Sequence, residues 1–245
     1  MKHEKYDVHY YQYIKDSFLA AEIDINDKQI EQLLKYYEML IETNKVMNLT
    51  AIIDFEDVVI KHFIDSLMIS KYIDLRNYKS LIDVGTGAGF PGIPLKIVYP
   101  HLNVCLMDSL NKRIGFLNNV IIELGLKNTK AVHERAEILG HYDNYRERYD
   151  ICVSRAVADL SVLSEYAIPF VKTEGYFIPY KSGDIEQELN NAGNALNELS
   201  SKIERKVEFV LPQTDFKRSI IFIKKEKKTS NKYPRKPGVP KKSPL

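Results

Sequence analysis

The 245-residue sequence has few cysteines, no long apolar run and little net charge. Its two cysteines, Cys105 and Cys152, lie inside short apolar runs without C-x-x-C spacing or a companion histidine cluster, so we expect buried thiols and no metal site. No run of about 18 uncharged apolar residues is present. The N-terminus opens with charged and aromatic residues rather than a signal-peptide pattern. We therefore expect a cytoplasmic protein that does not enter a membrane.

The net charge of +2 hides a basic C-terminus. The last 22 residues contain nine Lys or Arg and one Glu, a net of +8, which leaves −6 on residues 1–223. This asymmetry favours a polyanion partner, because neutralising phosphates releases their counterions. Four prolines in residues 232–244 predict a stiff, extended arm, and Tyr233 offers a face for stacking on a base. A tail that only improves solubility is the alternative.

The N-terminal part of the chain is helical in pattern. From residue 7 to about 72, apolar residues recur at helical spacing with almost no glycine or proline, which predicts two or three helices. One helix is capped by Asn26 or Asp27 and runs through Thr43. We expect an irregular connector at Asn44–Thr50 and a further helix that begins near Asp54.

From Tyr78 onward, short apolar runs alternate with longer amphipathic ones, which is typical of βαβ units and a parallel sheet. The predicted strands are Ser80–Gly85, Asn103–Asp108, Thr129–His133, Tyr149–Ser154, Gly175–Tyr180, Val207–Leu211 and Ser219–Lys224, and the clearest helices are Lys112–Leu124, Asp159–Phe170 and Ile185–Lys202. The last two strands form an antiparallel hairpin with a turn around Gln213–Lys217. Pro179 cannot donate to a strand ladder, so the boundaries of the fifth strand stay open.

These elements predict a doubly wound α/β sheet of seven mostly parallel strands. We expect an N-terminal helical extension over residues 1–75, a ligand-binding α/β domain over residues 76–225 and a basic, proline-rich arm over residues 226–245.

The connection after the first strand contains alternating glycines at Gly85, Gly87 and Gly89, followed by Phe90. Glycines let the backbone turn at φ values that a β-carbon resists, and they leave room for a ligand. In the dinucleotide fingerprint the third glycine would fall at position 90, where this chain has phenylalanine. G-x-G-x-G-F instead resembles the first motif of class I S-adenosylmethionine (SAM) methyltransferases. A plain strand-to-helix turn is the alternative.

Other candidate site residues follow strand ends, where open α/β sheets bind ligands. Asp108, 23 residues after Gly85, is placed to accept hydrogen bonds from both ribose hydroxyls of an adenosine, with a turn or cap role as the alternative. Ala136 and Glu137 lie in the loop that holds adenine in such folds, although a glutamate also suits a helix start. Arg155 can bind the methionine carboxylate or an RNA phosphate, or form a structural salt bridge.

Together these residues resemble the RsmG (GidB) methyltransferases over nearly the whole chain. The matching segments are Asn44–Thr50, His62–Leu67, Asp83–Gly92, Asp108–Arg113, Arg135–Glu137, Ser154–Ala156 and Tyr233–Arg235 with Gly238 and Pro240. The resemblance implies a Rossmann-like class I fold, SAM as cofactor and methylation of N7 of a guanine in 16S ribosomal RNA. It implies SAM contacts at Gly85, Phe90, Ala136, Glu137 and Arg155. The partner is then 16S rRNA or the small ribosomal subunit, and we expect a monomer.

The segment after the fourth strand bears on the acceptor atom. Methylation of exocyclic amines goes with an Asp/Asn-Pro-Pro-aromatic motif, which Ser154–Asp159 lacks, and cytosine C5 methylation needs an accessible thiolate. Guanine N7 has a free lone pair and needs no general base, so the lack of an evident acid/base dyad fits and no catalytic residue is assigned. An Arg155 fork on guanine O6 and N7 would mask the nucleophile.

Candidates for RNA contact, chosen by charge and position, are Lys112, Arg113, Lys181, Arg235, Lys236, Lys241 and Lys242. Alternatives to the rRNA enzyme are a SAM-dependent methyltransferase of another RNA, a protein or a small molecule, and an RNA-binding module without catalysis. A nicotinamide dehydrogenase is the weakest alternative, because of the glycine spacing and the lack of a catalytic domain after the sheet.

Overall fold

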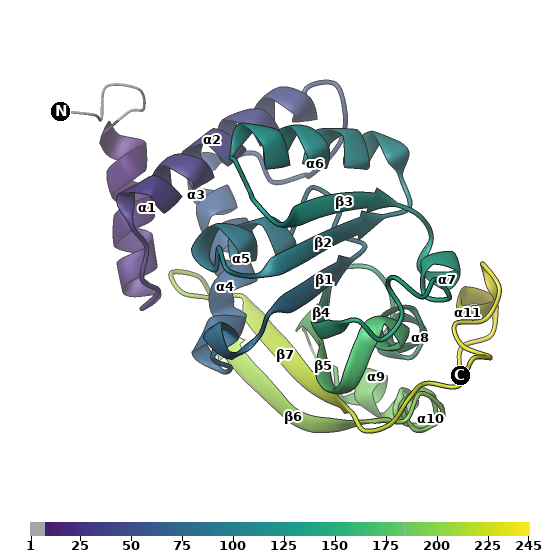
Figure 1. Cartoon of the computed structure of the whole chain (residues 1–245). Helices are drawn as coiled ribbons and strands as arrows, with labels where there is room; N and C mark the ends of the chain where they lie inside the picture. The colour runs from purple at the N-terminus through teal and green to yellow at the C-terminus, as the bar shows by residue number, and fades with distance from the viewer. Residues whose placement is uncertain (1–7, 184) are drawn as a thin grey trace.

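The strands of the computed structural model are β1 (Ser80–Val84), β2 (Asn103–Asp108), β3 (Thr129–His133), β4 (Tyr149–Arg155), β5 (Val171–Ser182), β6 (Ser201–Val210) and β7 (Lys217–Lys225). They form one sheet in the order β3-β2-β1-β4-β5-β7-β6 (Figure 1). Strands β1 to β5 pair in parallel, and β7 lies antiparallel between β5 and β6. The expected doubly wound sheet with an antiparallel C-terminal hairpin is confirmed.

The structure describes residues 8–183 and 185–245, so residues 1–7 of the predicted extension and Asp184 of the predicted α/β domain lie outside it. The α-helices are α1 (Val8–Ala20), α2 (Asp27–Asn44), α3 (Phe55–Val58), α4 (Asp65–Leu67), α5 (Gly92–Val98), α6 (Asn111–Glu123), α7 (Ala136–Leu139), α8 (Leu160–Ala167), α9 (Glu186–Asn191), α10 (Gly193–Glu198) and α11 (Val239–Lys242). A π-helical turn η1 (Val59–Ile64) joins α3 to α4, and shorter turns are η2 (Met68–Lys71), η3 (Leu75–Asn77) and η4 (Ile168–Phe170). In the described ranges no helix is long and apolar enough to cross a bilayer.

The helices cover both faces of the sheet (Figure 1). Side chains of a strand alternate between its faces, so Leu81 packs into a core with α1, α2, α5 and α6, whereas the adjacent Ile82 packs into a second core with α7, α8 and α10. The helical extension is therefore part of the first core. Its helices cover the sheet beside the glycine loop.

The helix starts of the extension agree with the expected caps. Asn26 forms a capping box with Gln29 at the start of α2, in which each side chain accepts from the other residue's backbone N–H. The Asp54 carboxylate accepts from two backbone N–H groups at the start of α3. Between these helices, Asn44 Oδ1 accepts from the amides of Leu49 and Thr50, which shapes the connector.

The predicted helix Ile185–Lys202 is wrong at its C-terminal end, because helix α10 ends at Glu198 and a strand begins at Ser201. The chain forms α9 and α10, and Ser200, in the left-handed region at φ 56°, turns it into β6 at Ser201. Because β6 is an edge strand and most of it is exposed, it lacks the apolar alternation that predicts a strand. Strand β5 was also longer than predicted and continues through Pro179, which lies opposite Ser154 of β4.

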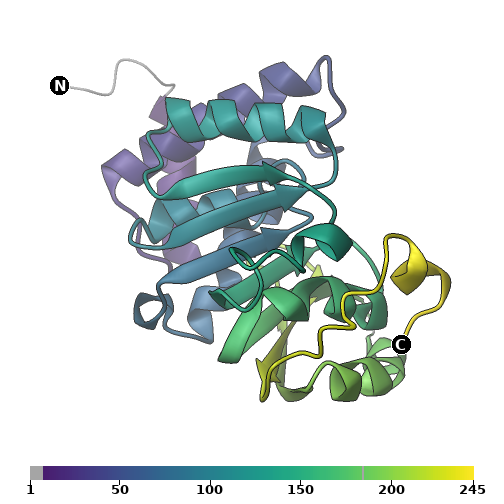
Figure 2. The ribbon, with the colours of Figure 1, turned by 45° about the vertical axis from the view of Figure 1, so that its right-hand side comes forward.

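Residues 226–245 fold back onto the domain rather than extending from it. Figure 2 shows this segment running beside α7 and α8. Tyr233 is only 3% exposed and packs in the second core, and its hydroxyl donates to Glu198 at 2.7 Å. The expected extended arm with a free Tyr233 stacking face is therefore wrong, because burial of that ring and hydrogen bonds to the segment's backbone hold it in place.

Candidate active site

The glycine loop after β1 has two different surroundings. Gly85, Gly87 and Gly89 all have positive φ, at 71°, 61° and 107°. A β-carbon on Gly89 would lie 2.6 Å from Ile93 Cγ1 and 2.7 Å from Tyr36 Oη, whereas one on Gly87 would meet nothing within 4 Å. Gly89 therefore packs against protein, whereas Gly87 faces open space that a side chain would enter. Such open space leaves room for a ligand that lies against the backbone.

Asp108, at the end of β2, fixes this loop. Its Oδ2 accepts from the Gly87 N–H at 3.0 Å and from Arg113 Nη1 at 3.1 Å, and its Oδ1 accepts from the Leu110 N–H at 2.9 Å. The carboxylate is 3% exposed. The turn role considered for Asp108 is thus present in the structure, at the same place where the ribose role is predicted. Binding of a ribose by Asp108 stays a prediction.

A second carboxylate, Asp83 of β1, lies buried beneath the loop. Its Oδ2 accepts from Thr86 Oγ1 at 2.7 Å and from the Gly92 N–H at 2.8 Å, whereas its Oδ1 is buried without a hydrogen-bond partner among the described residues. Burial raises the pKa of Asp83 to about 7. The loop therefore contains an unpaired acceptor that a cationic group or a water molecule would satisfy.

The Asp83 carboxyl gives the free energy of unfolding a defined pH dependence. Its pKa is about 7 in the folded chain against an ordinary value of 3.8, so between these values the folded state binds more protons. The contribution of the protonated Asp83 carboxyl to the unfolding free energy is therefore lost as pH rises from about 4 to about 7. Asp83→Asn cannot ionise and should flatten the slope, measured by urea unfolding at several pH values. An identical slope in both proteins would contradict this assignment.

Ala136 and Glu137 begin α7, next to the end of β3. Glu137 is 4% exposed, and its Oε1 accepts from the Gly238 N–H at 3.0 Å and from Arg135 Nη2 at 3.2 Å. Burial raises the pKa of Glu137, but these hydrogen bonds outweigh it, and the pKa lies below its ordinary value. The residue is therefore ionised at neutral pH. The backbone N–H of Glu134 donates to the Asp108 carbonyl at 3.3 Å, which brings this segment beside the glycine loop.

Arg155, at the end of β4, is held by the helical extension. Its Nη1 donates to Asp65 Oδ2 at 2.7 Å and to the Lys61 carbonyl at 3.3 Å. Asp65 is 3% exposed and also accepts from Arg218 Nε of β7 at 3.1 Å. The salt-bridge alternative is therefore what the structure shows for the Arg155 guanidinium. A contact of Arg155 with SAM stays a prediction.

His62 completes this cluster as a neutral acceptor. Burial and the charge of Arg155 lower the pKa of His62 to about 3. Since a guanidinium only donates, the Arg155 Nη2 donor at 3.2 Å requires His62 Nδ1 to accept, and Nε2–H then donates to Thr50 Oγ1 at 2.8 Å. The imidazole also stacks on Phe90, with ring centroids 4.3 Å apart. The Phe90 ring therefore packs against the extension, and its predicted SAM contact stays untested.

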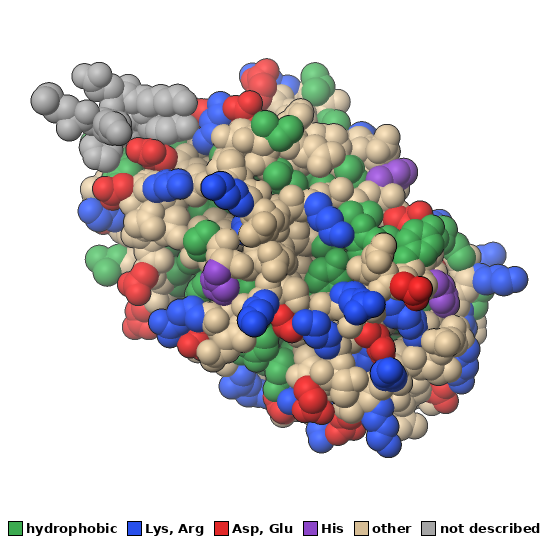
Figure 3. Space-filling model, in the orientation of Figure 1, with side chains coloured by type: hydrophobic (Ala, Val, Ile, Leu, Met, Phe, Trp, Pro, Cys, Tyr) green, Lys and Arg blue, Asp and Glu red, His purple; other side chains and the backbone are tan. Residues whose placement is uncertain are grey.

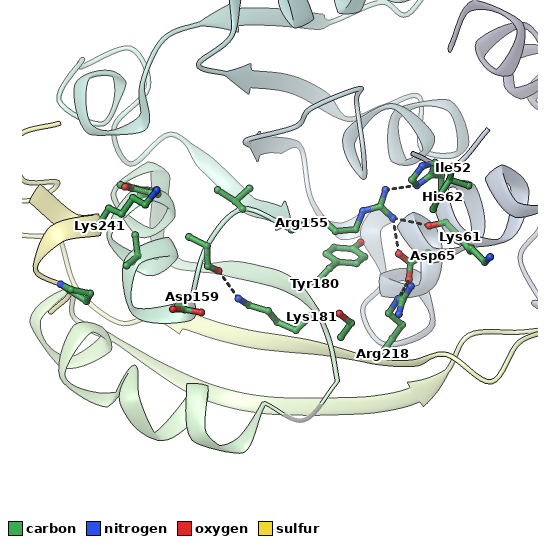
Figure 4. A pocket seen from close by; sticks show the side chains of 17 residues that line it. Ile52, Lys61, His62, Asp65, Arg155, Asp159, Tyr180, Lys181, Arg218 and Lys241 are labelled. Atoms are coloured by element: carbon green, nitrogen blue, oxygen red, sulfur yellow. Dashed lines mark hydrogen bonds and ion pairs between the residues drawn. The ribbon is translucent and has the colours of Figure 1, made fainter. Parts of the chain in front are cut away.

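A cleft of about 820 Å³, which we call the basic cleft, opens beside this cluster (Figure 4). It is lined by Ile52, Lys61, His62, Asp65, Arg155, Ala156, Val157, Ala158, Asp159, Val162, Tyr166, Tyr180, Lys181, Ser182, Arg218, Lys241 and Pro244. Five of these side chains are cationic and two are carboxylates, so the cleft has an excess of positive charge. Val157 connects it to the glycine loop, since a β-carbon on Gly85 would lie 2.6 Å from Val157 Cγ2.

The predicted RNA-contact residues separate into three groups. Lys181 and Lys241 line the basic cleft, although Lys181 also pairs with Glu188. Arg113 and Arg235 are bound by the carboxylates Asp108 and Glu165. The remaining three, Lys112, Lys236 and Lys242, are exposed and do not line the cleft. Figure 3 shows Lys and Arg side chains over the lower half of this face of the molecule, interspersed with carboxylates.

Three residues that surround Arg155 received no role from the sequence: His62, Asp65 and Arg218. A signal was present for two of them, since His62 and Asp65 lie three residues apart in a helical segment and therefore share one face. Nothing in the sequence indicates that this face meets Arg155, which is 90 residues from Asp65. Arg218 lies in a strand and has no local motif.

Comparison with known proteins identifies relatives over most of the chain. The family model described as rRNA small subunit methyltransferase G (GidB) matches residues 29–220. A ribosomal RNA small subunit methyltransferase G of Lachnoclostridium phytofermentans is 55% identical over 223 residues, which are 91% of this chain and 92% of the relative. The protein of the same name from Staphylococcus epidermidis is 50% identical over 234 residues, 96% of this chain and 98% of the relative. The resemblance seen in the sequence is confirmed.

Solved structures share the fold. The fibrillarin pre-rRNA processing protein of Methanococcus jannaschii covers 66% of this chain and 74% of its own, with a TM-score of 0.52 at 15% identity. The ribosomal protein L11 methylase of Lactobacillus delbrueckii subsp. bulgaricus covers 68% and 79%, with a TM-score of 0.50 at 18% identity. At these identities the likeness concerns the fold alone, and it agrees with the α/β methyltransferase fold expected from the glycine loop.

Proposed function

Because the chain belongs to the rRNA small subunit methyltransferase G family, we propose that it transfers the methyl group of SAM to N7 of a guanine in 16S rRNA. Family membership supports the transferase activity, the SAM cofactor and the small-subunit rRNA substrate. The choice of N7 rests on the chemistry of the acceptor and on the residues around the basic cleft.

The glycine loop leaves room for SAM at Gly87. A β-carbon there would meet no protein atom within 4 Å, and the Gly87 amide is fixed by Asp108. In this proposal Asp108 accepts from the ribose hydroxyls and Ala136–Glu137 contact the adenine. Bound SAM supplies an electrophilic methyl group on its sulfonium.

The chain then aligns the acceptor and excludes water, which are the main requirements of an in-line methyl transfer. Guanine N7 attacks with its free lone pair, so no side chain has to remove a proton. Positive charge develops on the base during transfer, and the cleft lining includes two carboxylates, Asp159 and the Asp65 carboxylate that pairs with Arg155 and Arg218. The guanidinium of Arg155 is held by Asp65 and His62, so it leaves guanine O6 and N7 free.

The cations of the basic cleft suit the phosphates around the target nucleotide, because lysine and arginine neutralise RNA phosphates with release of counterions. The glycine loop, Asp108, Glu137 and the basic cleft all come from one chain, and transfer to a lone pair needs no metal ion. We therefore propose a cytoplasmic monomer that acts on the small ribosomal subunit.

The test is incubation of the pure protein with methyl-labelled SAM and small ribosomal subunits from cells that lack this enzyme. We expect label at N7 of one guanine of 16S rRNA, located by the chain scission to which N7-methylguanine is susceptible. Subunits from cells that contain the enzyme are the control and should take up little label. Label on an amine nitrogen or a pyrimidine carbon would overturn the N7 assignment, and no label on rRNA would overturn the proposed substrate.

A further inference from the structure

The C-terminal segment, residues 229–245, reaches both parts of the site. The backbone N–H of Gly238 donates to Glu137 Oε1 at 3.0 Å, on the predicted cofactor side. A few residues later, Lys241 and Pro244 line the basic cleft. Figure 4 shows Lys241 approaching this cleft from the opposite side to Arg155 and Arg218. One short piece of chain therefore contacts the cofactor residues and the predicted RNA site.

Arg235 fixes this segment to the domain through a buried carboxylate. Glu165 of α8 is 1% exposed, and its Oε1 accepts from the Arg235 backbone N–H at 2.7 Å and from Arg235 Nε at 2.9 Å. Arg235 Nη2 donates to Glu165 Oε2 at 2.6 Å and to the Ser243 carbonyl at 2.8 Å. A guanidinium that donates to both oxygens of a carboxylate fixes the relative orientation of the two residues and also strengthens their attraction. Arg235 thus holds both ends of the stretch that contains Gly238 and Lys241.

The beginning of the segment has its own support. Arg146 donates from Nη1 to the Tyr233 carbonyl at 2.8 Å and from Nη2 to the Thr229 carbonyl at 2.8 Å. The Pro234 carbonyl lies 2.7 Å from His141 Nε2. These hydrogen bonds satisfy backbone carbonyls that would bind water in a solvated tail, so they support a segment that is packed on the domain.

Lys241 differs from the other cations of the basic cleft. Four of the five pair with carboxylates: Lys61 with Asp57, Lys181 with Glu188, and Arg155 and Arg218 with Asp65. Lys241 is exposed and has no such partner in residues 8–183 and 185–245. Its ammonium is therefore the one most free to accept an external anion. In a cleft next to a methyl-transfer site on RNA, that anion is a backbone phosphate.

We propose that the C-terminal segment is a wall shared by the cofactor and RNA sites. Arg235 is its positioning residue, Gly238 orients Glu137 for the cofactor, and Lys241 binds an RNA phosphate. This inference rests on the proposed function and extends it to residues beyond position 220, where the family match ends. It also separates the basic residues of the segment by role, since Arg235 serves docking and Lys241 serves RNA binding.

The test compares Lys241→Ala, Arg235→Ala and Arg235→Lys with Lys227→Ala, a matched control that removes an exposed lysine away from the cleft. Binding of unmethylated small ribosomal subunits is measured over a range of salt, and SAM binding by calorimetry. Lys241→Ala should weaken subunit binding roughly threefold to tenfold and lower the salt slope by roughly 0.7 to 0.9, with SAM affinity unchanged. Arg235→Ala should weaken both SAM and subunit binding, and Arg235→Lys should restore part of each.

Each result decides one point. If Lys241→Ala binds subunits with the same affinity and the same salt slope as Lys227→Ala, the proposed phosphate contact is overturned. A second outcome is that Arg235→Ala lowers the melting temperature but leaves the affinities for SAM and subunits unchanged below the unfolding transition. In that case the Arg235–Glu165 pair is only structural, and the positioning role is overturned. If the wild-type protein itself neither bound nor methylated subunits, the proposed function would fail, which is distinct from both of these outcomes.

Discussion

Arg235→Ala should lower the free energy of unfolding by about 3 kcal/mol, because it leaves the Glu165 carboxylate buried without its cation. Removal of one partner from a buried pair costs about 3 to 5 kcal/mol, and we expect the low end because the Arg235 side chain is 25% exposed and water can enter after truncation. For a chain of this size the melting temperature should fall by roughly 6 to 12 °C. Urea and thermal unfolding measure both quantities.

The control for this experiment is Lys236→Ala, which removes the neighbouring positive charge from an exposed position and should change stability by less than about 0.5 kcal/mol. The double variant Arg235→Ala/Glu165→Gln should recover part of the loss, since a buried amide costs less than a buried unpaired charge. Equal effects of Arg235→Ala and Lys236→Ala would show that the pair does not hold the segment.

Gly87→Ala should abolish most SAM binding while leaving the fold largely intact. Its methyl group would enter open space, where it meets no protein atom within 4 Å, so we expect a clash with SAM bound at the proposed site. The left-handed φ of 61° costs the folded state about 1 to 2 kcal/mol. We expect SAM affinity to fall at least roughly tenfold, as for loss of a contact worth about 1.4 kcal/mol or more. Calorimetry with SAM measures this effect.

Gly89→Ala is the matched comparison in the same loop. Its methyl group would lie 2.6 Å from Ile93 Cγ1 and 2.7 Å from Tyr36 Oη, so the cost falls on packing with the helical extension. With the strain at φ 107° added, the loss of unfolding free energy should reach about 2 to 5 kcal/mol. If Gly87→Ala bound SAM as the wild type does, the open space beside Gly87 would not be the cofactor site.

The parts of the site that follow from local chemistry were predictable from the sequence. Gly85, Gly87 and Gly89 occupy left-handed conformations as their spacing predicts, and Asp108 lies against this loop because β2 neighbours β1 in the expected sheet. The Asn26 cap is likewise a property of a few adjacent residues. In each case the residues that predict the feature and the residues that form it lie within one loop or one pair of neighbouring strands.

Contacts between distant segments were not predictable in this way. Arg155 meets Asp65 across 90 residues of chain, and the sequence of β4 alone fits a ligand contact as well as a salt bridge. The C-terminal segment reads as a solvated tail because its composition is basic and proline-rich. Its docking depends on Glu165, one carboxylate inside an apolar helix, and a single such residue carries no pattern.

The path of the last residues matters to anyone who produces this protein. Pro244 lines the basic cleft and Leu245 packs against the second core, so a purification handle or fluorescent fusion joined after Leu245 would emerge beside the basic cleft. The opposite end is safer, because Val8 is 71% exposed and α1 lies on the far side of the molecule from α11 (Figure 1). Activity assays should therefore use material tagged at the amino end or left untagged.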